Sequence, residues 1–191
     1  MRREVITVAG LLGSGKSSTS NRVAQVLGYR RFSAGDFQRT AAESLGLTYE
    51  KYQKVAEEDS QYDRKADDAL IEAGRQEKIV IDSRLGYHFL PDSFKVFLTL
   101  PREVAAGRIL KDAEVNPNRH KETTHGAKDV VSIVEAIEER QKSEQRRYEK
   151  YYGLKNIFDT ENFDLVIDTG MFSLEEVAQQ IVTAYKAWLV N

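Results

Sequence analysis

Short apolar runs recur along this chain, and they lack the strict alternation of a half-exposed strand. Four runs, at residues 5–9, 78–82, 94–100 and 165–168, are apolar almost throughout, and a weaker fifth covers residues 29–33. Continuous apolar runs of this length are typical of parallel strands that are covered on both faces. The pattern therefore predicts a five-stranded parallel sheet.

Longer polar segments with apolar positions three or four residues apart separate these runs and predict helices. Their ends carry helix signals, among them Gly28 and Gly153 after two helices and Ser173 before the last one. The predicted helices cover residues 18–27, 36–74 with breaks at Gly46 and near Asp59, 102–113, 129–152 and 174–189. Alternating strands and helices predict an α/β fold of three layers, in which ligands bind at the carboxyl ends of the strands.

The first apolar run leads directly into a phosphate-binding motif of the form GxxxxGK[ST]. Its residues are Gly10, Leu11, Leu12, Gly13, Ser14, Gly15, Lys16 and Ser17, and we expect Ser18 to join them in binding ATP. Glycines let successive backbone N–H groups point at phosphate oxygens. Lys16 supplies a charge to the β- and γ-phosphates, and Ser17 is the expected ligand of Mg²⁺. The alternative is a glycine-rich turn that binds nothing.

Composition narrows the choice of partners. The chain has 191 residues, a formal net charge of −2 and no cysteine. This charge does not favour general binding to nucleic acid or a membrane surface, and the lack of cysteine excludes disulfides and thiolate metal sites. No apolar run reaches the length of a membrane span. We expect a cytoplasmic protein that acts as a monomer.

Two charged residues follow the third strand. Asp82 ends that strand, where P-loop enzymes place the acid that holds Mg²⁺ or its waters, and Arg84 follows two residues later. In the functional interpretation Arg84 binds phosphate through its planar guanidinium. In the alternative interpretation Asp82 is a turn-forming residue and Arg84 makes a surface ion pair.

The long helix carries a charged stripe. Arg140, Glu144 and Arg147 are spaced i, i+4 and i+7, so they fall within roughly a sixth of the helix circumference. Taken alone, this stripe fits an ordinary solvated ion pair. Beside a P-loop, arginines that project into the cleft would neutralise charge on a transferring phosphoryl group.

Residues 116–128 contain proline, glycine and basic residues without an apolar cluster. The segment is either a lid over the phosphates or a plain surface loop. Its histidines, His120 and His125, lack the spacing of a metal site and are expected at the surface.

Several separated motifs together resemble the cytidylate kinases, in particular their compact archaeal kind. These motifs are the P-loop, the sequence SAGDFQR at residues 33–39, DSRLG at 82–86, RxxxExxRYxxYYG at 140–153 and DLVIDT at 164–169. The resemblance implies an ATP-dependent nucleoside-monophosphate kinase that uses Mg²⁺. It also implies a core of residues 1–35, 75–112 and 127–191, an NMP-binding region at 36–74 and a lid at 113–126.

The resemblance also implies roles for individual residues. Arg39 and Arg84 match positions that hold the acceptor monophosphate, and Arg108 matches the side that clamps ATP. Arg140 and Glu144 match positions near the acceptor's sugar and phosphate, and Arg147 matches one that reaches phosphate or base. Lys16, Arg140 and Arg147 are the expected catalytic residues.

The residue that follows Arg84 departs from the pattern of the longer bacterial cytidylate kinases, in which this position bears on base specificity. There an acid follows the residue equivalent to Arg84, whereas this chain has Leu85. A site that rejects uracil needs a hydrogen-bond acceptor for the cytosine amine. The candidates are Asp36 and a stripe of Asp59, Asp63 and Asp67, of which we favour Asp63.

These patterns favour transfer of phosphate from ATP to a pyrimidine monophosphate, CMP or dCMP. One alternative is another nucleotide or a small metabolite alcohol as acceptor. A second alternative is a protein that binds ATP without turning it over. The arginines beyond the P-loop argue against it, because ATP binding alone does not require them. A GTPase is disfavoured, because the chain lacks the NKxD motif that recognises guanine.

Overall fold

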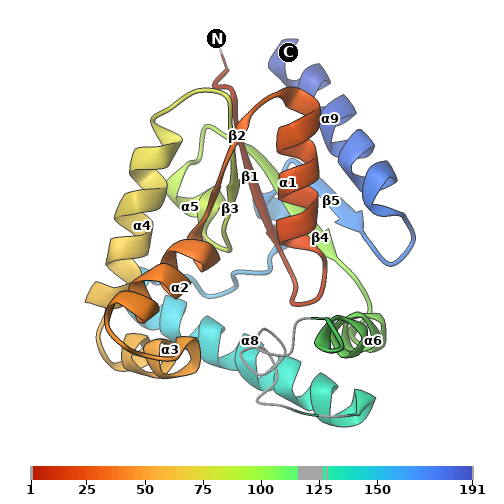
Figure 1. Cartoon of the computed structure of the whole chain (residues 1–191). Coiled ribbons are helices and arrows are strands. Elements are labelled where there is room, and N and C mark those ends of the chain that lie inside the picture. The colour runs from red at the N-terminus through yellow and green to blue at the C-terminus, as the bar shows by residue number, and fades with distance from the viewer. Residues whose placement is uncertain (1, 116–126, 128, 191) are drawn as a thin grey trace.

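The computed structural model describes residues 2–115, 127 and 129–190, and this part of the chain contains one five-stranded sheet (Figure 1). All neighbouring strands are parallel, in the order β2-β3-β1-β4-β5. The strands are β1 (Val5–Gly10), β2 (Arg30–Ser33), β3 (Ile79–Asp82), β4 (Phe94–Thr99) and β5 (Leu165–Asp168). The predicted α/β class and the five parallel strands are confirmed. The weak second run forms an edge strand, which explains its polar composition.

The predicted helices are also present, with two short additions. The sequence did not indicate α5 or the 3₁₀ turn η1. The helices are α1 (Lys16–Leu27), α2 (Ala34–Ser44), α3 (Tyr49–Glu58), α4 (Gln61–Gly74), α5 (Gly86–Phe89), α6 (Arg102–Ala113), α8 (Val130–Tyr152), η1 (Thr160–Asn162) and α9 (Leu174–Val190).

The two faces of the sheet bury different sets of side chains, because successive strand residues point to opposite sides. On one face Ile6, Val8 and Val80 pack in a core with α1 and α9. On the other face Val5 and Ile81 pack with residues of α4. Helices on both faces explain why the strands are apolar without alternation.

The long helix α8 crosses below the carboxyl ends of the strands in Figure 1, and α3 and α6 lie near its two ends. Asp129 caps its first turn by accepting from the backbone N–H of Ser132, and Gly153, at φ 70°, ends it. Ile133 and Ile137 are buried against α6. The helix therefore spans the edge of the sheet where ligands bind in folds of this kind.

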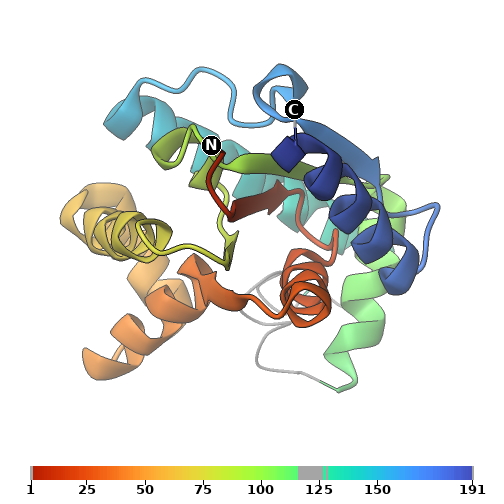
Figure 2. The same cartoon turned by 90° about the horizontal axis from the view of Figure 1, so that it is seen from above.

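Residues 36–74 form the expected helical excursion beside the sheet (Figure 2). The break at Gly46 is real, and Thr48 caps α3 by accepting from the backbone N–H of Lys51 at 3.3 Å. Asp59 lies between α3 and α4 and ends α3. Only Asp63 and Asp67 of the expected acidic stripe are therefore on one helix.

Both chain ends lie at the edge of the molecule opposite α8 (Figure 1). There the Arg2 guanidinium lies 4.5 Å from the centre of the Trp188 ring in α9. Within the described residues, none of the helices has the length and apolar character needed to cross a membrane.

Candidate active site

The loop between β1 and α1 has the backbone that phosphate binding requires. Gly13 and Gly15 have φ values of 77° and 80°, which disfavour residues with a side chain. A Cβ on Gly10 would lie 2.5 Å from the carbonyl oxygen of Leu98, so glycine lets the loop leave the sheet beside β4. No side chain caps the first turn of α1. Its N–H groups therefore face the loop, as in an anion site.

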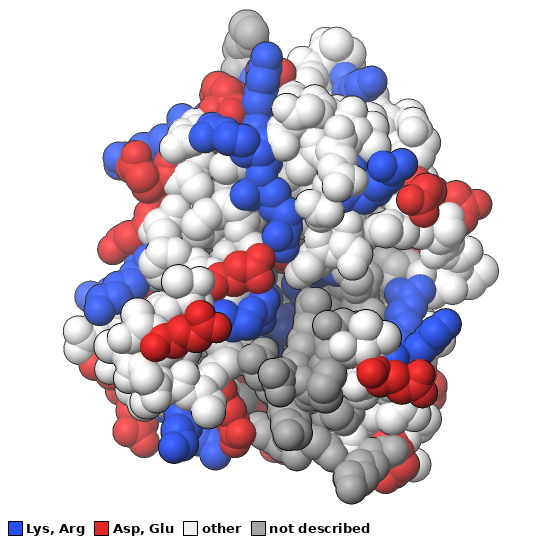
Figure 3. Space-filling view, viewed as in Figure 1, with Lys and Arg blue, Asp and Glu red and all other residues white. Residues whose placement is uncertain are grey.

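A cavity of about 150 Å³ lies beside this loop. It brings together side chains from the P-loop, α2, α4, the end of β3 and α8, which are far apart in the sequence. The expected site residues that line it are Leu12, Lys16, Ser17, Arg39, Asp63, Asp82, Arg84, Arg140, Glu144 and Arg147. In Figure 3, basic side chains run in a stripe toward the hollow in this face, and acidic side chains lie beside the end of the stripe.

Glu144 is the centre of the charged cluster in this cavity. Its carboxylate lies 2.7 Å from Arg84 Nε and 3.1 Å from Arg140 Nε, and only 5% of the residue is exposed. Burial alone would raise the pKa of Glu144, but Arg84, Arg140 and Arg147 hold it below its usual range. Arg84 also donates to the backbone oxygen of Gly10 at 3.1 Å. The cluster thus joins α8 to the start of the P-loop.

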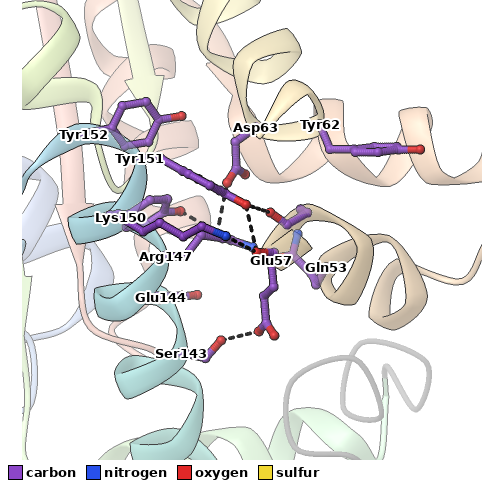
Figure 4. A network of polar contacts seen from close by, with 12 residues as sticks. Gln53, Glu57, Tyr62, Asp63, Ser143, Glu144, Arg147, Lys150, Tyr151 and Tyr152 are labelled. Carbon is purple, nitrogen blue, oxygen red and sulfur yellow. Dashed lines mark hydrogen bonds and ion pairs between the residues drawn. The ribbon is translucent and has the colours of Figure 1, made fainter. Parts of the chain in front are cut away.

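Arg147 forms a second buried pair on the next turns of α8 (Figure 4). Its Nε lies 3.1 Å from Asp63, and the side chains of both residues are at most 5% exposed. Its other nitrogens donate to Gln53 Oε1 at 3.0 Å and to the Tyr148 hydroxyl at 3.2 Å. Burial raises the pKa of Asp63 although Arg147 opposes that shift. The pair presents a carboxylate and a guanidinium side by side.

Contacts from α8 also hold the end of α3 in place (Figure 4). The Tyr151 hydroxyl donates to the backbone oxygen of Glu57 at 2.8 Å, and Lys150 donates to the same oxygen at 3.4 Å. The Ser143 hydroxyl donates to the Glu57 carboxylate. Because the final carbonyls of a helix lack partners within it, these bonds satisfy the end of α3 while docking it. The part of the cavity wall that α3 forms, which carries Gln53, is thereby fixed relative to α8.

Lys16 lies in the same charged surroundings. Its pKa is lowered to about 7, first by burial and next by Arg84, while Asp82 and Glu144 act in the opposite direction. An anion bound beside Lys16 would raise its pKa again, because a neighbouring negative charge favours the ammonium.

The oxygens of Ser17 and Asp82 suit Mg²⁺. Both side chains line the cavity next to Lys16. Mg²⁺ prefers one or two protein oxygens and takes its remaining ligands from phosphates and water. The described part of the chain holds no group of three or more His, Cys, Asp or Glu residues that could hold a metal ion.

Eight expected residues do not line the cavity, namely Gly10, Leu11, Gly13, Ser14, Gly15 and Ser18 of the P-loop segment, and Asp36 and Arg108 outside it. Asp36 pairs at 2.6 Å with Arg39, which lines the cavity. Arg108 of α6 donates to the hydroxyl and the backbone oxygen of Thr169, at 3.0 and 2.6 Å. It therefore joins α6 to the loop after β5. Residues 116–126, which contain most of the expected lid with His120 and His125, lie outside the described part of the chain.

Sequence reasoning missed several residues of the site. Gln38 and Gln53 line the cavity and interact with Asp63 and Arg147, respectively. Arg31, on β2, pairs with Asp82 at 2.7 Å. Gln38 lies in the SAGDFQR motif at residues 33–39, whereas Gln53 and Arg31 belong to no motif. The packing that brings the three residues here joins segments far apart in the chain.

Comparison with known proteins finds matches that cover most of this chain. The chain matches the model of the cytidylate kinase-like family over residues 5–171. It is 33% identical to a cytidylate kinase of Pyrococcus horikoshii, over 91% of this chain and 83% of that one. It is 32% identical to an S-adenosylmethionine-dependent nucleotide dehydratase of Lacinutrix mariniflava, over 95% of this chain but only 36% of that longer protein.

Solved structures support the fold alone, because their sequences differ widely from this one. A shikimate kinase from Acinetobacter baumannii, solved with shikimate, superposes with a TM-score of 0.62 at 17% identity. The match covers 95% of this chain and 92% of that one.

The charge on Glu144 should stabilise the fold. We expect Glu144→Gln to lower the free energy of unfolding by about 3–5 kcal/mol at pH 7, since it leaves buried guanidiniums without their carboxylate. The folded-state pKa of Glu144 is depressed, so its contribution is present above the unfolded-state pKa and is lost as the pH falls through the folded-state value. Urea unfolding at several pH values measures both effects.

The matched control is Glu139→Gln, which removes an exposed carboxylate on the same helix that pairs with Lys142. It should change stability by less than about 0.5 kcal/mol. Equal effects of the two substitutions, or a loss at Glu144 that stays constant into strong acid, would contradict this account of the cluster.

Proposed function

This chain belongs to the cytidylate kinase-like family, and on that premise we propose that it transfers the γ-phosphoryl group of ATP to CMP or dCMP. It is a phosphotransferase of the nucleoside-monophosphate kinase class. The observation that carries the proposal is the convergence of Arg84 and Arg140 on one buried carboxylate, Glu144, beside the P-loop. An ATP-binding protein without a second phosphate to hold needs no such cluster.

The P-loop receives the ATP phosphates in this proposal. Backbone N–H groups of residues 10–18 surround them, and the Lys16 ammonium neutralises charge that develops during transfer. Ser17 and Asp82 are the residues that would hold Mg²⁺. When bound, Mg²⁺ supplies further neutralisation of phosphate charge.

The acceptor phosphate lies among Arg39, Arg84 and Arg140. Glu144 holds the last two guanidiniums in place before any substrate arrives, so they need little reorganisation when the phosphate binds. The attacking atom is a phosphate oxygen of the monophosphate, which is already ionised near neutral pH. The reaction therefore needs positioning and charge neutralisation rather than a strong base.

Asp63 and Arg147 form the part of the cavity that we assign to the base. Cytosine carries a donor amine next to two acceptors, its ring nitrogen and its carbonyl oxygen. A carboxylate beside a guanidinium has the complementary order of acceptor and donor. Uracil has a carbonyl in place of the amine, so it would leave Asp63 without a donor and at a cost. All of these groups come from one chain, so the proposal requires neither a partner subunit nor nucleic acid.

A coupled assay that follows ADP formation tests the reaction. We expect rapid turnover with ATP and CMP or dCMP, and slower turnover with UMP, AMP, GMP and shikimate. The variant Lys16→Ala should lose on the order of 100- to 1,000-fold in kcat, because it removes charge stabilisation of the transition state without disturbing the sheet. Preference for a different acceptor would favour the alternative substrates. ATP binding without turnover of any acceptor would overturn the proposed reaction.

The charged stripe on α8 gives a test with an internal control. Arg140→Met and Arg147→Met should each lower kcat/KM by an amount corresponding to about 2–4 kcal/mol, because each removes a cation held in the cavity. Arg146 is exposed and does not line the cavity, so Arg146→Met should change kcat/KM by an amount corresponding to less than about 0.5 kcal/mol. Thermal unfolding separates losses of activity from losses of stability. Small, equal effects at all three positions would refute the assignment of this stripe.

Base recognition is tested at Asp63. Asp63→Asn keeps the size of the side chain but replaces one acceptor oxygen with a donor, so kcat/KM for CMP should fall at least tenfold more than that for UMP. Asp59→Asn is the control, since Asp59 lies outside the cavity and accepts from Gln61. If the values for CMP and UMP fall together, or neither falls, the base is recognised elsewhere.

A further inference from the structure

Arg31 contacts the cavity indirectly. Its side chain is 21% exposed and does not line the cavity, but its Nη2 lies 2.7 Å from the Oδ2 atom of Asp82, which does. The Asp82 side chain is 6% exposed, so its carboxylate is almost entirely removed from water. A carboxylate at this depth requires a counter-charge. Arg31 supplies it with a planar group of fixed shape.

The sheet fixes where Arg31 can reach. In the register of β2 and β3, Arg31 lies opposite Val80 and Ser33 lies opposite Asp82. Arg31 and Ser33 are two residues apart and therefore point to the same side of the strand. The Arg31 side chain runs toward the carboxyl end of the sheet and meets Asp82 there. Arg30, the neighbouring residue, points to the opposite side and is exposed.

A second carboxylate extends this contact to the acceptor side. Asp36 Oδ2 lies 3.1 Å from Arg31 Nη1, and Asp36 Oδ1 lies 2.6 Å from Arg39 Nη2. The Ser33 hydroxyl accepts from the backbone N–H of Asp36 at 3.2 Å and so fixes the start of α2. Four charges of alternating sign therefore run from Arg39 through Asp36 and Arg31 to Asp82.

We propose that Arg31 is a positioning residue that holds the Asp82 carboxylate for the divalent cation and, through Asp36, sets the charge available on Arg39. The inference rests on the proposed function, in which Asp82 faces Mg²⁺ and Arg39 faces the acceptor phosphate. Arg31 occupies Oδ2 of Asp82, so the other oxygen is left for the cation. It also shares the charge of Asp36, so Arg39 is only partly neutralised and still attracts a phosphate.

Removal of Arg31 should therefore have two effects. Without Arg31, Lys16 is the cation that remains near Asp82, and the Asp82 carboxylate should turn toward it. The oxygen that we assign to the divalent cation would then no longer be held in position. Asp36 interacts with Arg39 alone, which weakens the attraction of Arg39 for phosphate. Residues that orient metal ligands from behind typically contribute 10- to 100-fold to metal affinity.

The test measures Mn²⁺ binding directly, by electron paramagnetic resonance titration of the full chain with ADP present, without turnover. We expect Arg31→Met to weaken Mn²⁺ affinity about tenfold or more and to raise the KM for CMP several-fold. Arg31→Lys keeps the charge but loses the planar group, so it should recover only part of either effect. Arg30→Met is the matched control on the same strand and should change neither value. Thermal unfolding confirms that each variant is folded.

Each other outcome of this test is decisive. Unchanged Mn²⁺ affinity in Arg31→Met overturns the inference, and tighter binding does so too, since it would mean that Arg31 only competes with the cation for Asp82. If Arg31→Lys kept the full Mn²⁺ affinity and the KM for CMP of the unmodified protein, Arg31 would act only as a counter-charge. That result would also overturn the inference. Asp82→Asn distinguishes the two levels of the account. If it leaves Mn²⁺ affinity unchanged, the metal site of the proposed function fails, whatever Arg31 does.

Discussion

The buried carboxylate of Glu144 is the interaction on which the rest of the cavity depends. Three arginines, Arg84, Arg140 and Arg147, act on this one acid, and their separate burial would be costly without it. By holding Arg84 it joins the end of β3 to α8, and Arg84 in turn contacts the first residue of the P-loop. One charge thus brings together, from three separate parts of the chain, the groups that we propose bind phosphate.

The helix α8 extends this organisation across the whole cavity. Glu144 lies midway along the charged stripe, and the next turns carry Arg147 and Tyr151, which contact α4 and α3. The wall that carries Asp63 is therefore positioned by the same helix that carries Glu144 and Arg140, to which we assign the acceptor phosphate. A monophosphate has both a phosphate and a base, and a rigid helix of 23 residues is long enough to present a separate contact to each.

Much of this arrangement could be predicted from sequence, because it follows from local patterns. The P-loop is contiguous, the strands are short apolar runs, and the Arg140–Glu144–Arg147 stripe follows from helical periodicity. Arg31 could not be predicted, because its contact with Asp82 depends on the register of two strands about fifty residues apart. The expected stripe of three acids was wrong at Asp59, since the break between α3 and α4 removes that residue from the helical face. The pairing of Arg108 with Thr169 depends on how α6 meets β5, which no local pattern encodes.

We propose that the two halves of an acceptor monophosphate meet two separate groups beside α8, the phosphate at Arg84 and Arg140 and the base at Asp63 and Arg147. A crystal structure of the protein with CMP and a non-hydrolysable ATP analogue tests it most directly. The account predicts the CMP phosphate within hydrogen-bonding distance of Arg84 and Arg140, with the cytosine amine against Asp63. A CMP bound in the reverse orientation, or outside the cavity that Glu144 organises, would contradict it.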